Sequence, residues 1–171
     1  GTQADLNDYQ NMLSWIASNN MASASNYQKA CEMLDTDNFI KYIAVNVYAN
    51  NRDWPHNNVR AWKYTGTANS KYGQDGKWRF ILKDIDYSWG IINSPGATEN
   101  VIAEETSHSE NVLRGGAGEI SAAFASLMRN AQFKEAFLDF MDEMINNYFS
   151  EETACAMITE MKNAMAKEYS H

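Results

Sequence analysis

The sequence contains no run of about 18 apolar residues, so we expect no helix that crosses a bilayer. Cysteine is also scarce, with only Cys31 and Cys155 among 171 residues. Two cysteines are too few for a disulfide framework or a structural zinc site. Because both fall in segments with a helical pattern, we expect two buried thiols.

Positive charge is the third shortage. The chain has 14 lysine and arginine residues against 22 aspartate and glutamate residues, which gives a formal net charge of −8. This balance argues against a nucleic-acid partner, because nucleic-acid-binding proteins need a basic surface. Hydrophobic residues still make up 44% of the chain and aromatic residues 12%. Composition and length together predict one globular domain over residues 1–171.

The first part of the chain, residues 6–50, carries apolar residues at helical spacing. We expect three helices there, the second capped by Ser25 or Asn26 and the third by Asp35 or Asp37. The third contains NFIKYIAVNVYAN, which is apolar on most of its faces. A helix of this kind belongs in the middle of a domain, so we expect it to be the central helix.

The middle of the chain reads differently. The segments VRAWKYT and KWRFIL have the β-branched and aromatic content of strands, and Asp75-Gly76 lies between them as a turn signal. We expect a β-hairpin with a long tip. A stretch with little periodicity follows from Asp84 to Gly118, and a loop of that length inside a compact domain is often functional.

The last part is helical again, with patterned segments at residues 120–129, 133–148 and 151–169. Ser150 is the expected N-cap of the last of these. Methionines recur at helical spacing, and we expect them to fill the core; they are Met141, Met144, Met157, Met161 and Met165. The fold class predicted from the whole pattern is mainly α, of the α+β type.

Four polar side chains flank the predicted hairpin. Asp53 and Asn58 precede its first strand, and Asp84 and Asp86 follow its second. If the hairpin closes, the start of one strand and the end of the other lie side by side, so these four side chains converge. Three carboxylates and an amide would attract a hard divalent cation, which relieves their mutual repulsion.

This pattern is also typical of phosphoryl transfer. A protein-kinase catalytic loop contains R-D-x-x-x-x-N, and a later aspartate holds magnesium. Arg52, Asp53 and Asn58 reproduce the first motif, and the loop containing Asp84 stands for the second. Simpler interpretations stay open: Asp53 could accept backbone N–H bonds in a helix-exit turn in which Pro55 ends the helix, and Asp86 could face water.

The stretch DTDNFIKYIAVNVYANNRDWPHNN, followed by GKWRFILKDIDYSWG, resembles the CotH family of spore-coat-protein-H-like atypical protein kinases. The specific parts are D-W-P-x-N-N and D-x-D-x-x-W-G. The resemblance implies a helical, kinase-like C-terminal lobe with a hairpin that carries the catalytic and metal loops. It implies ATP-dependent phosphorylation of Ser/Thr on secreted or cell-surface proteins. By position, Asp53 would be catalytic, whereas Asn58, Asp84 and Asp86 would bind ATP with Mg²⁺ or Mn²⁺.

A kinase also needs an upstream lobe with a lysine for the phosphates, and nothing before residue 35 has such a strand-rich pattern. We therefore expect a C-terminal lobe whose N-terminal lobe is missing from this chain, inactive when isolated. One alternative is a non-catalytic module of an extracellular, cellulosome-like multimodular assembly, with Ca²⁺ in the acidic cluster. Another is a pseudokinase. The expected partners are a Ser/Thr protein substrate and other extracellular modules.

Overall fold

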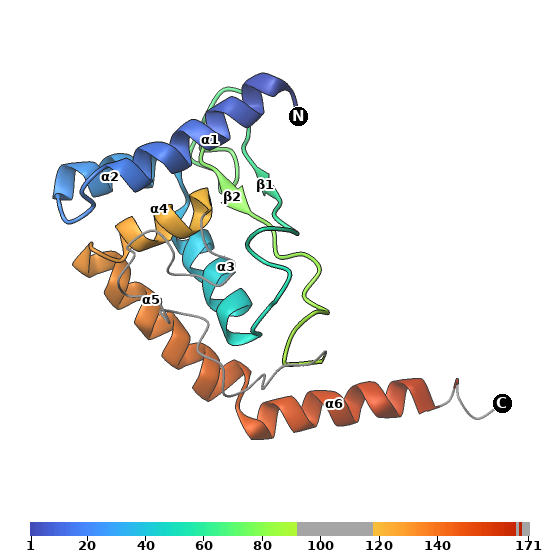
Figure 1. The fold of residues 1–171 in the computed structure, drawn as a ribbon. Helices are drawn as coiled ribbons and strands as arrows, with labels where there is room; N and C mark the ends of the chain where they lie inside the picture. The colour runs from blue at the N-terminus through green and yellow to red at the C-terminus, as the bar shows by residue number, and fades with distance from the viewer. Residues whose placement is uncertain (92–117, 167, 169–171) are drawn as a thin grey trace.

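The computed structural model describes residues 1–91, 118–166 and 168. The architecture is mainly helical with one two-stranded sheet, as the sequence predicted (Figure 1). No described helix is both long enough and apolar enough to cross a membrane. The elements in chain order are α1 (Gln3–Ser18), α2 (Ala24–Met33), α3 (Thr36–Tyr48), β1 (Ala61–Trp62), β2 (Arg79–Phe80), α4 (Glu119–Leu127), α5 (Ala131–Glu143), the π-helical turn η2 (Met144–Tyr148) and α6 (Glu151–Ala166).

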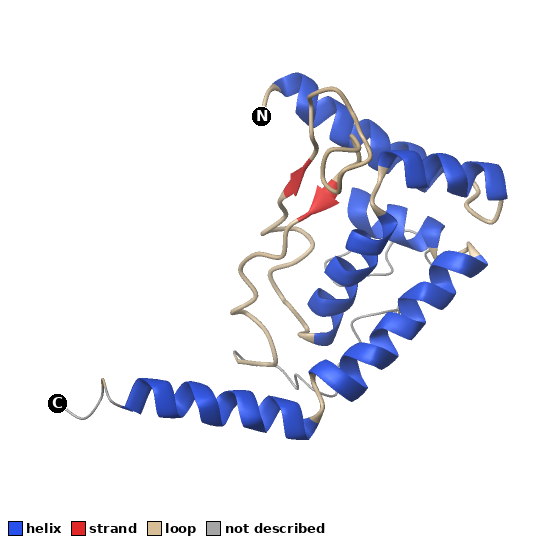
Figure 2. Ribbon diagram, turned by 180° about the vertical axis from the view of Figure 1, so that it is seen from behind, coloured by secondary structure: helices blue, strands red, loops and turns tan. Residues whose placement is uncertain are grey.

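Helix α3 is the central helix, as its apolar pattern predicted. Figure 2 shows it between α5 and the two strands, while α1 packs against α4. The aromatic rings of Phe39 and Tyr42 lie 5.1 and 4.9 Å from the ring of Phe80 on β2. Contacts of this kind contribute about 0.5–1.5 kcal/mol each beyond the area they bury. The buried residues of α3 are Phe39, Ile40, Tyr42, Ile43, Ala44, Asn46 and Val47.

The start of α2 differs from the prediction. The helix begins directly after Ser23, so Ser25 and Asn26 lie inside it and neither is the N-cap. The reason is a tight turn before the helix, in which Ser23 N–H donates to the carbonyl of Asn20 at 3.1 Å. The Asn26 side chain donates to that same carbonyl at 3.0 Å, so it closes the turn and does not cap the helix.

The hairpin forms where predicted, but its strands are only two residues long. Ala61 pairs with Phe80 and Trp62 with Arg79 in an antiparallel register. The ladder stops because the first strand leaves it at Lys63, whose ammonium group pairs with Asp8 of α1. The long tip is then closed by its own turns, including Gly76 at a φ of 75°, a conformation that glycine adopts without strain.

The second edge of β2 is hydrogen-bonded to the start of α3. Trp78 N–H donates to the carbonyl of Met33 at 2.8 Å, and its own carbonyl accepts from Asp35 N–H at 3.0 Å. Two residues further along, the Asn38 side chain exchanges two hydrogen bonds with the backbone of Phe80, at 2.7 and 3.1 Å. Strand β2 and the beginning of α3 are therefore held side by side.

From this shared start, α3 and the chain after β2 extend toward the same end of the molecule (Figure 1). Thirteen helical residues at about 1.5 Å each cover about 20 Å. The extended chain from Trp78 to Asp84, at about 3.3 Å per residue, covers about 20 Å as well. The loop after α3 and the loop after β2 consequently reach the same place.

Two expectations about the core are wrong. Cys31 is half-buried, Cys155 is exposed, and both are free thiols. Met144 is buried, but α6 has no buried residue, because it extends away from the rest of the domain (Figure 1). The burial that the methionine pattern predicted for this helix is therefore not found. The exposed apolar residues of α6 are Met157, Ile158, Met161 and Met165.

A buried arginine joins the hairpin to α3. The guanidinium of Arg79 donates two hydrogen bonds to Asp75 at 2.8 Å, and its Nε lies 2.8 Å from the carboxylate of Asp35. Asp35 is also the N-cap of α3, as predicted, accepting from Asn38 N–H at 3.1 Å. The side chain of Arg79 is only 2% exposed. Its buried positive charge would therefore destabilise the fold without the two carboxylates that pair with it.

We expect Arg79→Met to lower the free energy of unfolding by about 3–5 kcal/mol at neutral pH. The variant keeps the apolar stem but leaves two carboxylates without their buried partner. Urea unfolding followed by tryptophan fluorescence measures the loss. The matched control is Lys41→Met, which breaks the exposed pair with Asp37 and should cost less than about 1 kcal/mol. Equal losses in the two variants would contradict the proposed importance of Arg79.

The Asp75 carboxylate should make the free energy of unfolding depend on pH in the acid range. The hydrogen bonds from Arg79 hold the pKa of the Asp75 carboxyl at about 2, below the ordinary 3.8. A depressed folded-state pKa stabilises the fold fully above the unfolded value, and this stabilisation is lost as pH falls through about 2. The side chain is 28% exposed, so we expect a contribution of about 1–2 kcal/mol. In urea unfolding, the stability difference between wild type and Asp75→Asn should shrink by that amount between pH 5 and pH 2.

Candidate functional site

The loop after α3 holds Asp53 in a defined orientation. One carboxylate oxygen accepts from the Asn57 amide at 3.0 Å and the other from the Asn58 amide at 2.8 Å. His56 Nε2 lies 3.8 Å from the first oxygen, a distance too long for a hydrogen bond. The carboxylate keeps part of its surface open to solvent, with 35% of the side chain exposed. Asp53 is therefore both fixed and accessible.

Two features of this loop explain its composition. Asn50 and Asn58 have φ values of 50° and 57°, and asparagine tolerates this left-handed region better than most residues. Trp54 is buried and donates from Nε1 to the Tyr42 hydroxyl of α3 at 2.7 Å. The loop is thus a turn anchored to the central helix, but Pro55 does not end that helix, because α3 already ends at Tyr48.

The loop after β2 is bonded directly to this one. Arg52 N–H donates to the carbonyl of Tyr87 at 2.9 Å, and Trp89 N–H donates to the carbonyl of Ala49 at 2.8 Å. These bonds cross between segments that are far apart in sequence. The predicted side-by-side arrangement of the two loops is confirmed.

The four predicted site residues are arranged less tightly than expected. Asp53 and Asn58 contact each other. The Asp84 carboxylate lies 3.4 Å from the ammonium group of its neighbour Lys83, and Asp86 is exposed. Among the described residues, no three acidic, histidine or cysteine side chains come close enough to hold a metal ion. Carboxylates without a cation between them repel one another, which opposes a tight cluster.

The donor types nevertheless suit a metal ion that a nucleotide brings. Because the Asn58 amide nitrogen donates to Asp53, its carbonyl oxygen is the atom left for a cation. Asp84 has 45% of its side chain exposed, and Asp86 is exposed as well. Magnesium is usually held by one or two carboxylates together with water and substrate phosphates. The residues therefore fit nucleotide-bound Mg²⁺ better than an ion enclosed entirely by protein.

Comparison with known proteins identifies the family. A family model described as CotH kinase protein matches residues 1–171. The chain belongs to the CotH kinase family. No curated protein and no solved structure gives a significant match. The resemblance read from the two aspartate motifs is thus confirmed, and the match covers both helical ends as well as those motifs.

Sequence reasoning missed several residues of this CotH-family site. Asn57 and Asn51 orient Asp53 from both sides, since Asn51 Oδ1 accepts from Asp53 N–H at 3.2 Å. Tyr42 holds the loop through Trp54. The signal was the paired asparagines on either side of Asp53, but the sequence does not show that Asn57 and Asn58 both donate to the carboxylate while Asn51 accepts from the backbone N–H.

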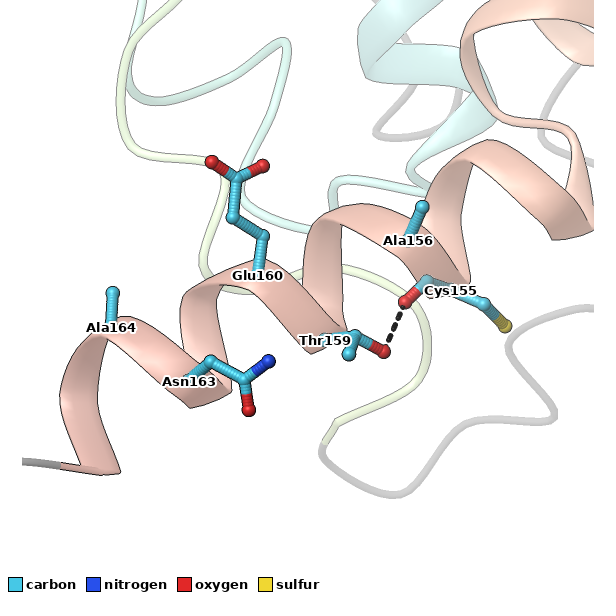
Figure 3. A pocket seen from close by; sticks show the side chains of 6 residues that line it. All are labelled: Cys155, Ala156, Thr159, Glu160, Asn163 and Ala164. Atoms are coloured by element: carbon cyan, nitrogen blue, oxygen red, sulfur yellow. Dashed lines mark hydrogen bonds between the residues drawn. The ribbon is translucent and has the colours of Figure 1, made fainter.

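A separate hollow lies on α6. Figure 3 shows six residues that line it, and these described residues all come from α6; the Thr159 Oγ1 hydroxyl donates to the Cys155 carbonyl at 2.8 Å. None of the predicted site residues contributes to it. The lining residues are Cys155, Ala156, Thr159, Glu160, Asn163 and Ala164.

We expect Tyr42→Phe to lower the free energy of unfolding by about 1–3 kcal/mol, because it leaves the buried Trp54 indole N–H without its acceptor. Chemical denaturation of both proteins measures the difference. Tyr9→Phe is the control: Tyr9 packs against the same Phe80 ring, and its hydroxyl has no hydrogen-bond partner among the described residues. An equally large loss in the control would contradict the role given to the Tyr42 hydroxyl.

Proposed function

We propose that this CotH-family chain is the C-terminal lobe of a kinase that transfers phosphate from ATP to Ser/Thr of secreted or cell-surface proteins. The observation that carries the proposal is the Asp53 carboxylate, oriented by two amides in a loop that is bonded to the Asp84 loop. Family membership supports kinase-like chemistry. The acidic composition disfavours a nucleic-acid substrate.

In this proposal Asp53 orients the acceptor hydroxyl and accepts its proton as phosphate transfer proceeds. The amides of Asn57 and Asn58 hold the carboxylate so that it cannot rotate away from the acceptor. Asn58 and Asp84 would hold Mg²⁺ or Mn²⁺, with Asp86 near them. The metal ion, when bound, neutralises negative charge on the phosphates.

A complete kinase also needs a cover over the nucleotide and a lysine that reaches its phosphates. We propose that an N-terminal lobe supplies both, and that the isolated chain does not turn over. The alternative, a calcium-binding module of a cellulosome-like assembly, needs six to eight oxygen ligands. Family membership favours kinase-like chemistry, so the kinase proposal is the better supported one.

The test uses the full-length protein, labelled ATP with Mg²⁺, and a library of peptides with a central serine or threonine. Asp53→Asn and Asp84→Asn should each lower kcat at least about 100-fold, the typical contribution of a general base or a metal ligand. Asp37→Asn is the matched control, since this exposed aspartate pairs with Lys41 at the start of α3 and should leave kcat unchanged. Phosphate incorporation by both site variants at the wild-type rate would refute the proposal.

A further inference from the structure

One buried asparagine contacts both halves of the candidate site. Asn51 is only 3% exposed and lies between the end of α3 and Asp53. Its side-chain oxygen accepts from Asp53 N–H at 3.2 Å, and its amide nitrogen approaches the carbonyl of Asp84 at 3.4 Å. A single side chain therefore lies against the backbone of both aspartates.

The same amide is tied to the central helix. Asn51 Nδ2 donates to the side-chain oxygen of Asn46 at 2.9 Å, and Asn46 Nδ2 donates to the carbonyl of Tyr42 at 2.9 Å. A buried polar chain thus runs from α3 through two asparagines to the Asp84 backbone. In a buried setting such groups are costly to leave unpaired, so their geometry is strongly constrained.

The backbone of Asp84 needs such a constraint. Its φ is 58°, a left-handed conformation that is strained for most residues and persists when its surroundings hold it. Among the described residues, its side chain approaches the ammonium group of Lys83, the adjacent residue in the chain. The contact from Asn51 joins the Asp84 backbone itself to the loop of Asp53, in addition to the backbone hydrogen bonds of Arg52 and Trp89 that link the two loops further along.

We propose that Asn51 is a positioning residue that sets the separation of Asp53 and Asp84 through its buried amide. The inference rests on the proposed function, since the two aspartates act on one phosphate transfer only if that function is correct. The amide itself touches neither substrate nor nucleotide. Misplacing a reacting group by about 1 Å can cost about 100-fold in rate, so the link is expected to matter for turnover.

A serine variant isolates this link. In Asn51→Ser the hydroxyl can still accept from Asp53 N–H, because serine forms the same local turn as asparagine. It is too short to reach Asn46 and Asp84 as well. The matched control is Asn130→Ser, at another buried asparagine. Asn130 caps α5 and donates to the carbonyl of Met21 at 2.9 Å, and serine keeps such a cap while losing the longer bond.

The experiment compares both variants with wild type in the full-length protein by hydrogen–deuterium exchange and by steady-state kinetics. In Asn51→Ser, exchange of peptides covering residues 49–53 and 84–91 should rise about tenfold. The kcat should fall about 10- to 100-fold, and the KM for the acceptor peptide should stay within twofold. In Asn130→Ser, exchange should rise around residues 20–23 and 130–134, with kcat within twofold of wild type.

The outcomes separate the two proposals. Unchanged exchange at residues 49–53 and 84–91 in Asn51→Ser, or an equal loss of kcat in both variants, would overturn the positioning role. A wild-type protein without phosphate transfer would overturn the proposed function, while the exchange pattern alone would still decide whether Asn51 couples the loops. If Asn51→Ser does not fold, Asn46→Ser should show the same exchange pattern with a smaller rise.

Discussion

The structure depends on one buried charge, the guanidinium of Arg79. It sits between the carboxylate that caps α3 and the carboxylate at the hairpin tip, with the rings of Tyr72 and Trp62 at 4.6 and 5.7 Å. This contact fixes where the central helix and β2 both begin. The helix and the extended chain after β2 then cover similar lengths. The loops at their far ends, about 20 Å from Arg79, therefore come to lie side by side.

The elements of this fold that the sequence predicts are those with a periodic apolar pattern or a clear turn signal. The apolar faces of residues 38–50 identified the central helix, and the turn signal at Asp75-Gly76 identified the hairpin. The hairpin then implied that the loops of Asp53 and Asp84 meet, which they do through backbone hydrogen bonds. Local pattern and topology were enough here because the apolar spacing and the turn signal agreed with the tertiary contacts that formed.

What the sequence did not reveal depends on contacts between distant side chains. Asn38 satisfies the backbone of Phe80 across the domain, and the buried partners of Asn51 include both a helix and a loop. An asparagine in a polar turn looks the same in sequence whether it is solvated or buried. The methionines of α6 failed as core predictions for a related reason, since helical spacing does not say whether a partner surface exists.

The position of α6 has a consequence for how the molecule loses structure. An isolated helix of 16 residues is only marginally stable in water, because nucleation is costly and no packed face offsets it. Since α6 buries none of its residues in the domain, its hydrogen bonds can open while α3 and the loops beside it stay closed. A single melting temperature would therefore describe the central helix and its neighbours, and the last helix would fray separately.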